Sequence, residues 1–148
     1  MELNVKDYVT KNKEILKREI TESGLKPRLT IIKNNNDPRS DAYVRNKIKA
    51  CEYVGIKSLS YRLDKDTSED EVVKLVQGLS EDKSVDGILV QLPLPKHISE
   101  EKVLSHIAPE KDVDGFTSVN IGNLLLGKPC LASCTPQGVI TMLKDNNI

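Results

Sequence analysis

The segment Asp86-Gly-Ile-Leu-Val-Gln91 decides the fold class of this chain of 148 residues. Its apolar residues are consecutive, which is typical of a strand buried on both faces, as in a parallel sheet covered by helices on each side. Around it, short β-branched strands are predicted over 29–32 and 56–63. The predicted helices are 4–23, 40–54, 68–79, 99–107, 121–126 and 135 to the C-terminus. This alternation predicts an α/β fold, a three-layer α/β/α domain with a mostly parallel sheet.

Capping residues in the sequence predict where several helices begin. Ser68-Glu-Asp-Glu71 is a capping box, and Ser40 and Ser99 are predicted N-caps. Thr135 is predicted as an N-cap followed by Pro136 at the first helical position. These signals predict where four of the helices begin.

The composition argues against several classes of protein. Lys+Arg and Asp+Glu both total 22, so no general attraction to nucleic acid or a lipid surface is expected. No segment approaches the ~20 apolar residues that span a bilayer, and the N-terminal stretch lacks the apolar core of a signal peptide. Three cysteines without a CxxC pair argue against a disulfide framework and a zinc site, and predict reduced thiols in a cytoplasmic protein.

The predicted helix over 40–54 carries a lysine of unusual placement. Ligands of parallel sheets bind at the carboxyl ends of strands, and this helix follows such an end. Tyr43 and Lys47 lie one above the other at the edge of the helix's apolar stripe, whereas Lys49 lies on the solvated side. Partial desolvation would disfavour the charged form of Lys47 and make it a candidate base. The alternative is a lysine that extends from the core edge into solvent.

Two further polar positions sit at predicted strand ends or turns. Gln91 ends the buried strand, so its amide either meets a ligand or bonds loop backbone. Asp112 and Asp114 precede Gly115 without the further oxygen ligands of a calcium loop, so no metal is expected. A carboxylate here could accept paired hydrogen bonds from an aminopyrimidine edge, or could form a plain aspartate turn.

No nucleotide-binding or hydrolase signature is present in the sequence. No two glycines are two residues apart, which excludes the dinucleotide fingerprint, and no P-loop is expected either. No Ser-His-Asp arrangement is apparent, and His97 and His106 are expected to be solvated.

Four segments together resemble one enzyme family. They are Ser40-Asp-Ala-Tyr-Val-Arg-Asn-Lys-Ile-Lys49, Val85-Asp-Gly-Ile-Leu-Val-Gln-Leu-Pro-Leu-Pro95, Pro109-Glu-Lys-Asp-Val-Asp-Gly115 and Cys134-Thr-Pro-Gln-Gly138. In the same order, they resemble the bifunctional methylenetetrahydrofolate dehydrogenase/methenyltetrahydrofolate cyclohydrolases. The resemblance implies that 1–148 is the folate-binding catalytic domain. The family's second domain, a Rossmann domain for NADP (NAD in some members), is expected to be absent from this chain.

The resemblance also implies residue roles. Lys47 matches the catalytic lysine, Gln91 the glutamine that works with it, Tyr43 the tyrosine that stacks on folate, and Asp114 the aspartate that binds the pterin ring. We therefore expect Lys47, Gln91, Tyr43 and Asp114 to be catalytic. Ser40 would lie near the lysine.

Further expectations follow from the family. Pro93 would line the same cleft. The family's first strand usually ends in Val and Gly where this chain reads Ile32-Lys-Asn-Asn-Asn36, and Asn could replace Gly because it tolerates left-handed angles. The complete enzyme is expected to be a cytoplasmic homodimer that binds tetrahydrofolate derivatives and NADP in one-carbon metabolism and purine biosynthesis.

Two other functions are open at this stage. The chain could be an isolated folate-binding module with little turnover. It could also be the substrate domain of a protein like an amino-acid dehydrogenase, although Gln91 and Asp114 within their motifs argue against that.

Overall fold

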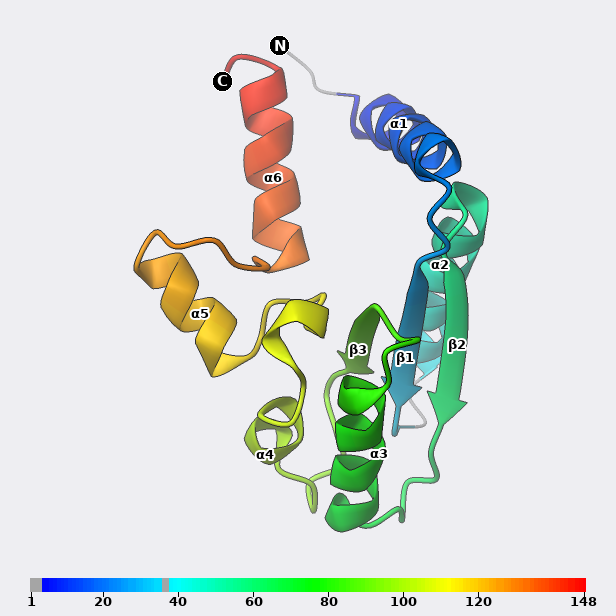
Figure 1. Cartoon of the computed structure of the whole chain (residues 1–148), viewed down its shortest axis with the longest axis vertical. Coiled ribbons are helices and arrows are strands. Elements are labelled where there is room, and N and C mark those ends of the chain that lie inside the picture. Colours follow the sequence, from blue (N-terminus) through cyan, green and yellow to red (C-terminus); the bar gives the residue numbers. More distant parts are fainter. Residues whose placement is uncertain (1–3, 36–37) are drawn as a thin grey trace.

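A computed structural model describes residues 4–35 and 38–148, except for the side chain of residue 39. Its sheet has three parallel strands, β1 (Arg28–Lys33), β2 (Lys57–Arg62) and β3 (Gly87–Gln91), in the order β2-β1-β3 (Figure 1). The helices are α1 (Val5–Ser23), α2 (Pro38–Val54), α3 (Glu69–Glu81), α4 (Glu100–Leu104), the 3₁₀ helix η1 (Pro109–Lys111), α5 (Ser118–Leu125) and α6 (Cys134–Asp145).

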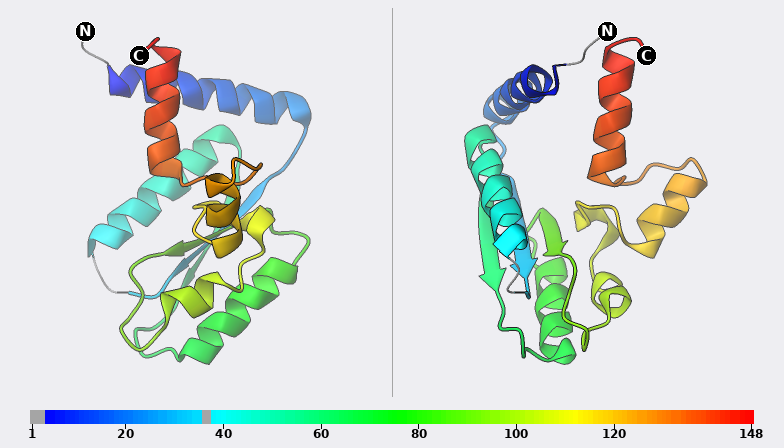
Figure 2. Two further views of the ribbon diagram at one scale, coloured as in Figure 1. Left: turned by 90° about the vertical axis from the view of Figure 1, so that its left-hand side faces the viewer. Right: turned by 180° about the vertical axis from the view of Figure 1, so that it is seen from behind.

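Helices cover both faces of the sheet, as Figure 2 shows. On one face, Val44 of α2 packs against Ile31 and Leu89. On the other face, α3 and α4 pack against Ile32 and Val90. The predicted three-layer α/β/α architecture with a parallel sheet is therefore confirmed. The apolar run of β3 is buried on both faces, because its alternate residues enter different clusters.

Two predicted helix caps are wrong. Helix α2 begins at Pro38, so Ser40 is a buried residue of its first turn and not its N-cap. Helix α6 begins at Cys134 after the N-cap Ser133, which places Thr135 inside the helix. A proline fits anywhere in a first turn, because the N–H groups there have no partner within the helix, and so Pro136 fixes the start only approximately. Asn34 and Asn35 do not adopt the left-handed angles that were expected for the asparagine run, and Asn36 lies outside the described residues.

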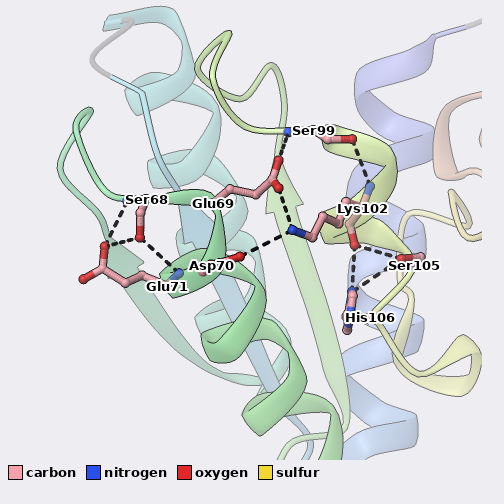
Figure 3. A network of polar contacts seen from close by, with 8 residues as sticks. All are labelled: Ser68, Glu69, Asp70, Glu71, Ser99, Lys102, Ser105 and His106. Atoms are coloured by element: carbon pink, nitrogen blue, oxygen red, sulfur yellow. Dashed lines mark hydrogen bonds and ion pairs between the residues drawn. The ribbon is translucent and has the colours of Figure 1, made fainter.

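The predicted starts of α3 and α4 are confirmed, and one network fastens the two helices together (Figure 3). Ser68 and Glu71 form the capping box, and Ser99 caps α4. The Glu69 carboxylate accepts hydrogen bonds from the Ser99 backbone N–H and from Lys102 Nζ, both at 2.7 Å. Helix α4 ends at Leu104, earlier than predicted.

One of the two histidines departs from the expectation that both are solvated. His97 is exposed, as predicted, and its ring lies 3.0 Å from the Thr67 carbonyl oxygen. His106 is half-buried, and its Nδ1 lies 2.8 Å from the Lys102 carbonyl oxygen. The His97 ring thus contacts a neighbouring segment, whereas the His106 ring contacts the helical turn that directly precedes it in the sequence.

Candidate active site

Three of the predicted site residues line one pocket. Lys47 comes from α2, Gln91 from the carboxyl end of β3, and Asp114 from the turn before α5. The pocket has a volume of about 210 Å³, and the first residues of α6 close one side. An adjoining pocket of about 510 Å³ shares Lys47 and Asp114 but has apolar walls that include Leu89. A polar pocket next to a larger apolar one suits a ligand with a polar head on a flat hydrophobic body.

Lys47 and Lys49 differ in burial, as the helical spacing predicts. Val44 and Ile48 turn one face of α2 onto the sheet. Lys47 is half-buried at the edge of this face, and Lys49 is exposed. The Lys47 ammonium is close enough to Asp114 to oppose the effect of burial on the pKa of that carboxyl. Lys47 therefore does not simply extend into solvent, and its catalytic role stays a prediction.

The two aspartates of the acidic turn have different environments. Asp112 is 2 % exposed and accepts hydrogen bonds from the Thr117 backbone N–H at 2.8 Å and from Asn120 Nδ2 at 3.0 Å. Burial acts to raise the pKa of Asp112, but these hydrogen bonds outweigh it and the pKa is lowered. Burial raises the pKa of Asp114, and the charge of Asp112 adds to the effect. Asp112 thus holds the turn together, while Asp114 faces the pocket.

The nitrogen and the oxygen of the Gln91 amide have different environments. Its Nε2 donates to the Leu92 carbonyl oxygen at 3.0 Å, so half of the amide bonds loop backbone. Its Oε1 is buried and has no hydrogen-bond partner among the described residues. An unsatisfied buried acceptor costs roughly 1–3 kcal/mol. A ligand or water that donates to this oxygen would remove that cost.

Three other predicted residues lie outside the walls of both pockets. Tyr43 is 65 % exposed, one helical turn before Lys47. Ser40 is buried in the first turn of α2. Pro93 follows a cis peptide bond and is exposed, and its carbonyl oxygen accepts a hydrogen bond from Asn35 Nδ2 at 2.9 Å. Their contacts with a ligand stay predictions.

The start of α6 contributes residues that had no role predicted from the sequence. Cys134 lines both pockets, and its Sγ donates to the Val113 carbonyl oxygen at 3.2 Å. Burial raises the pKa of its thiol, with the charge of Asp114 acting in the same direction. Gly115 has a φ of +67°, and a Cβ there would lie 2.6 Å from the Leu131 carbonyl oxygen, so only glycine allows this close approach. The Cys134–Gly138 motif was the one signal that pointed here.

Neither a metal centre nor a membrane span emerges from the part of the chain that the structure describes. Within 4–35 and 38–148, no group of three or more His, Cys, Asp or Glu is arranged to hold a metal ion. No helix in these ranges is long and apolar enough to cross a membrane.

Residues 3–114 match the family model for the catalytic domain of tetrahydrofolate dehydrogenase/cyclohydrolase. The chain belongs to this family. It is 55% identical over 142 residues to the bifunctional protein FolD of Agathobacter rectalis, a match that covers 94% of this chain and 51% of that protein. The chain thus spans about half the length of the curated relatives that it matches.

Solved structures of the family agree with this placement. The FolD methylenetetrahydrofolate dehydrogenase/cyclohydrolase of Campylobacter jejuni superposes with a TM-score of 0.92 at 43% identity, over 97% of this chain and 52% of that one. The Trypanosoma brucei enzyme, solved in complex with NADP cofactor and inhibitor, gives a TM-score of 0.92 at 28% identity, over 100% of this chain and 52% of that one.

Proposed function

We propose that this chain supplies the folate site and the catalytic lysine of a methylenetetrahydrofolate dehydrogenase/methenyltetrahydrofolate cyclohydrolase. The observation that carries the proposal is the convergence of Lys47, Gln91 and Asp114 on one pocket. Their side chains come from three elements that lie far apart in the sequence. Each also offers the chemistry that the reaction needs.

The hydrolytic half of the reaction needs only groups within this chain. Water attacks the methenyl carbon of the cationic folate, a C–O bond forms, and the Lys47 amine takes the proton that leaves the water. The bond from this carbon to N5 then breaks and the proton returns to that nitrogen, while the hydroxyl on the carbon loses its proton to solvent as the C=O bond forms, which yields 10-formyltetrahydrofolate. Gln91 Oε1 accepts a hydrogen bond from the attacking water and orients it. Asp114 accepts hydrogen bonds from the amino edge of the pterin.

The dehydrogenase half would need NADP, which would supply the hydride acceptor. The described residues do not fit this cofactor. Neither Asn34-Asn35, which follows β1, nor Leu92-Pro93, which follows β3, supplies a glycine turn that opens a helix toward a pyrophosphate. We therefore assign the nucleotide site, the Rossmann domain and the homodimer contact to the half of the relatives' length that this chain does not span.

The cellular setting is part of the same proposal. Oxidoreductase and hydrolase activity of a complete enzyme would place it in one-carbon metabolism, with 10-formyltetrahydrofolate available for purine biosynthesis. The three cysteines are free thiols, which supports a reducing compartment and thus the cytoplasm.

The test is a pair of titrations of the purified chain followed by a turnover assay. Isothermal titration with a folate analogue should give a saturable isotherm, weaker than in a two-domain relative, and NADP should give none. Loss of the near-ultraviolet absorbance of 5,10-methenyltetrahydrofolate reports hydrolysis. Folate binding without hydrolysis would favour the alternative of an isolated binding module. An NADP isotherm would contradict the assignment of the nucleotide site.

A further inference from the structure

Asp41, in the first turn of α2, joins the ends of two strands. Its Oδ1 lies 2.6 Å from Lys33 Nζ, at the end of β1, and 2.8 Å from an Arg62 guanidinium nitrogen, at the end of β2. Lys33 is only 3 % exposed. A buried ammonium requires a partner of opposite charge, so the Lys33–Asp41 contact strongly constrains the packing.

This ion pair lies at the same edge of the sheet as Gln91. Arg62, Lys33 and Gln91 are the last residues of β2, β1 and β3, and they are register partners across the sheet. Register partners in a parallel pair point to the same face. That face is the one covered by α2, because Lys33 reaches Asp41 there.

The helical period links Asp41 to Lys47. At roughly 100° per residue, Asp41 and Lys47 lie on opposite sides of Val44, which is buried beneath α2. The Asp41 side faces β1 and β2, and the Lys47 side faces Asp114. Holding the Asp41 side therefore fixes how far α2 can rotate about its axis. Lys47 is six residues, or about 9 Å, further along the same helix.

We infer that Lys33, Asp41 and Arg62 form a positioning network that sets the orientation of α2 and thereby holds Lys47 against Asp114 and Gln91. None of the three is a catalytic residue, because they act through Lys47. The consequence for folate chemistry rests on the proposed function, whereas the positioning itself does not.

The test compares Asp41→Asn with Lys102→Met in the full chain. Lys102→Met is the matched control, because it breaks the 2.7 Å ion pair between Lys102 and Glu69 on the far side of the sheet. The readout is the rate at which an amine-selective reagent labels Lys47, divided by the rate for Lys49, with mass spectrometry to identify each site. This ratio needs no folate and would not respond to a uniform loss of stability.

The expected result is that Asp41→Asn changes the Lys47/Lys49 ratio by about threefold or more, since a displacement of about 1 Å at a reactive group has large effects. Lys102→Met should leave the ratio unchanged, because its ion pair lies on the far side of the sheet from α2. Binding of a folate analogue should weaken by about tenfold in Asp41→Asn alone. A ratio that stays at the wild-type value in the folded Asp41→Asn chain overturns the inference.

A second variant keeps the test decisive if Asp41→Asn fails to fold because it leaves the Lys33 charge buried. Arg62→Met removes the exposed partner and leaves no buried charge unpaired, so it should fold and change the ratio in the same direction. An unchanged ratio in Arg62→Met would then overturn the inference. If the ratio changes but the wild-type chain binds no folate analogue, the positioning stands and the proposed function fails.

Discussion

Asp112 and Asp114 are separated by one residue, and we expect opposite changes in stability when each is replaced by asparagine. Asp112 accepts two hydrogen bonds as a buried carboxylate, from the Thr117 backbone and the Asn120 amide. Both donors bond the same oxygen, Oδ2, so asparagine at position 112 can present a carbonyl oxygen to them but only as a neutral acceptor. The loss of charge assistance in two buried hydrogen bonds is worth about 1–3 kcal/mol of unfolding free energy.

Asp114→Asn should raise stability at neutral pH. Burial penalises the Asp114 carboxylate by more than the Lys47 ammonium offsets, so a neutral amide removes a net cost. The expected gain is on the order of 1 kcal/mol. The same substitution should weaken binding of a folate analogue, because a carboxylate offers two accepting oxygens to the paired donors of an amino-pyrimidine edge, whereas an amide offers one accepting oxygen and a donating NH₂ group. A gain in stability with a loss of binding is the signature of a site residue.

The pH dependence follows from the directions of the two pKa shifts. The pKa of Asp112 is lowered by folding, so its stabilisation is present above the unfolded pKa of about 3.9 and is lost as pH falls through the folded pKa. The pKa of Asp114 is raised by folding. Its penalty is therefore full above the folded pKa and disappears as pH falls toward about 3.9.

Urea unfolding followed by circular dichroism suits a chain without tryptophan. Measured from neutral to acidic pH, the advantage of Asp114→Asn over wild type should shrink as pH falls toward about 4. The deficit of Asp112→Asn should persist to lower pH. Urea midpoints that move in the same direction for both variants at pH 7 would refute the assignment of a structural role to Asp112 and a ligand role to Asp114.

Three further variants test other parts of the site and the fold. Lys47→Met should remove hydrolysis of 5,10-methenyltetrahydrofolate by the chain. Lys49→Met should retain it, because Lys49 is exposed on another side of α2. Equal losses of hydrolysis in the two variants would exclude Lys47 from the reaction. Tyr43→Ala should weaken binding of a folate analogue by up to about tenfold in a fluorescence titration, the range of one stacking contact. Tyr53→Ala, the control on the same helix, should not weaken it. Lys111→Met should lower the unfolding free energy by about 1–3 kcal/mol. The reason is that Lys111 Nζ donates to carbonyl oxygens at and after the end of α3, the nearest at 2.7 Å. An unchanged transition temperature in calorimetry would contradict this.

Local patterns in the sequence were enough to predict the layers of the fold. The consecutive apolar residues of β3 predicted burial on both faces, because a strand's side chains alternate between faces. The helical period separated Lys47 from Lys49, since their positions on a helix follow from spacing alone. The capping box at Ser68–Glu71 is likewise a contact between near neighbours in sequence.

Only the tertiary structure decided which polar groups find partners. The acidic turn has no periodicity, so the sequence could not show that Asp112 bonds Thr117 while Asp114 faces the pocket. The start of α6 was misplaced for a related reason, because proline is tolerated throughout a first turn.

Contacts between elements depend on strand register, which the sequence does not specify. The side chains of Lys33 and Arg62 meet Asp41 because the last residues of β1 and β2 are paired in register. These two residues are 29 positions apart in the chain. The sequence determined which residues face the interior. The packing of strands and helices determined which of those residues meet, because hydrogen bonds and ion pairs require the atomic distances that only the assembled fold provides.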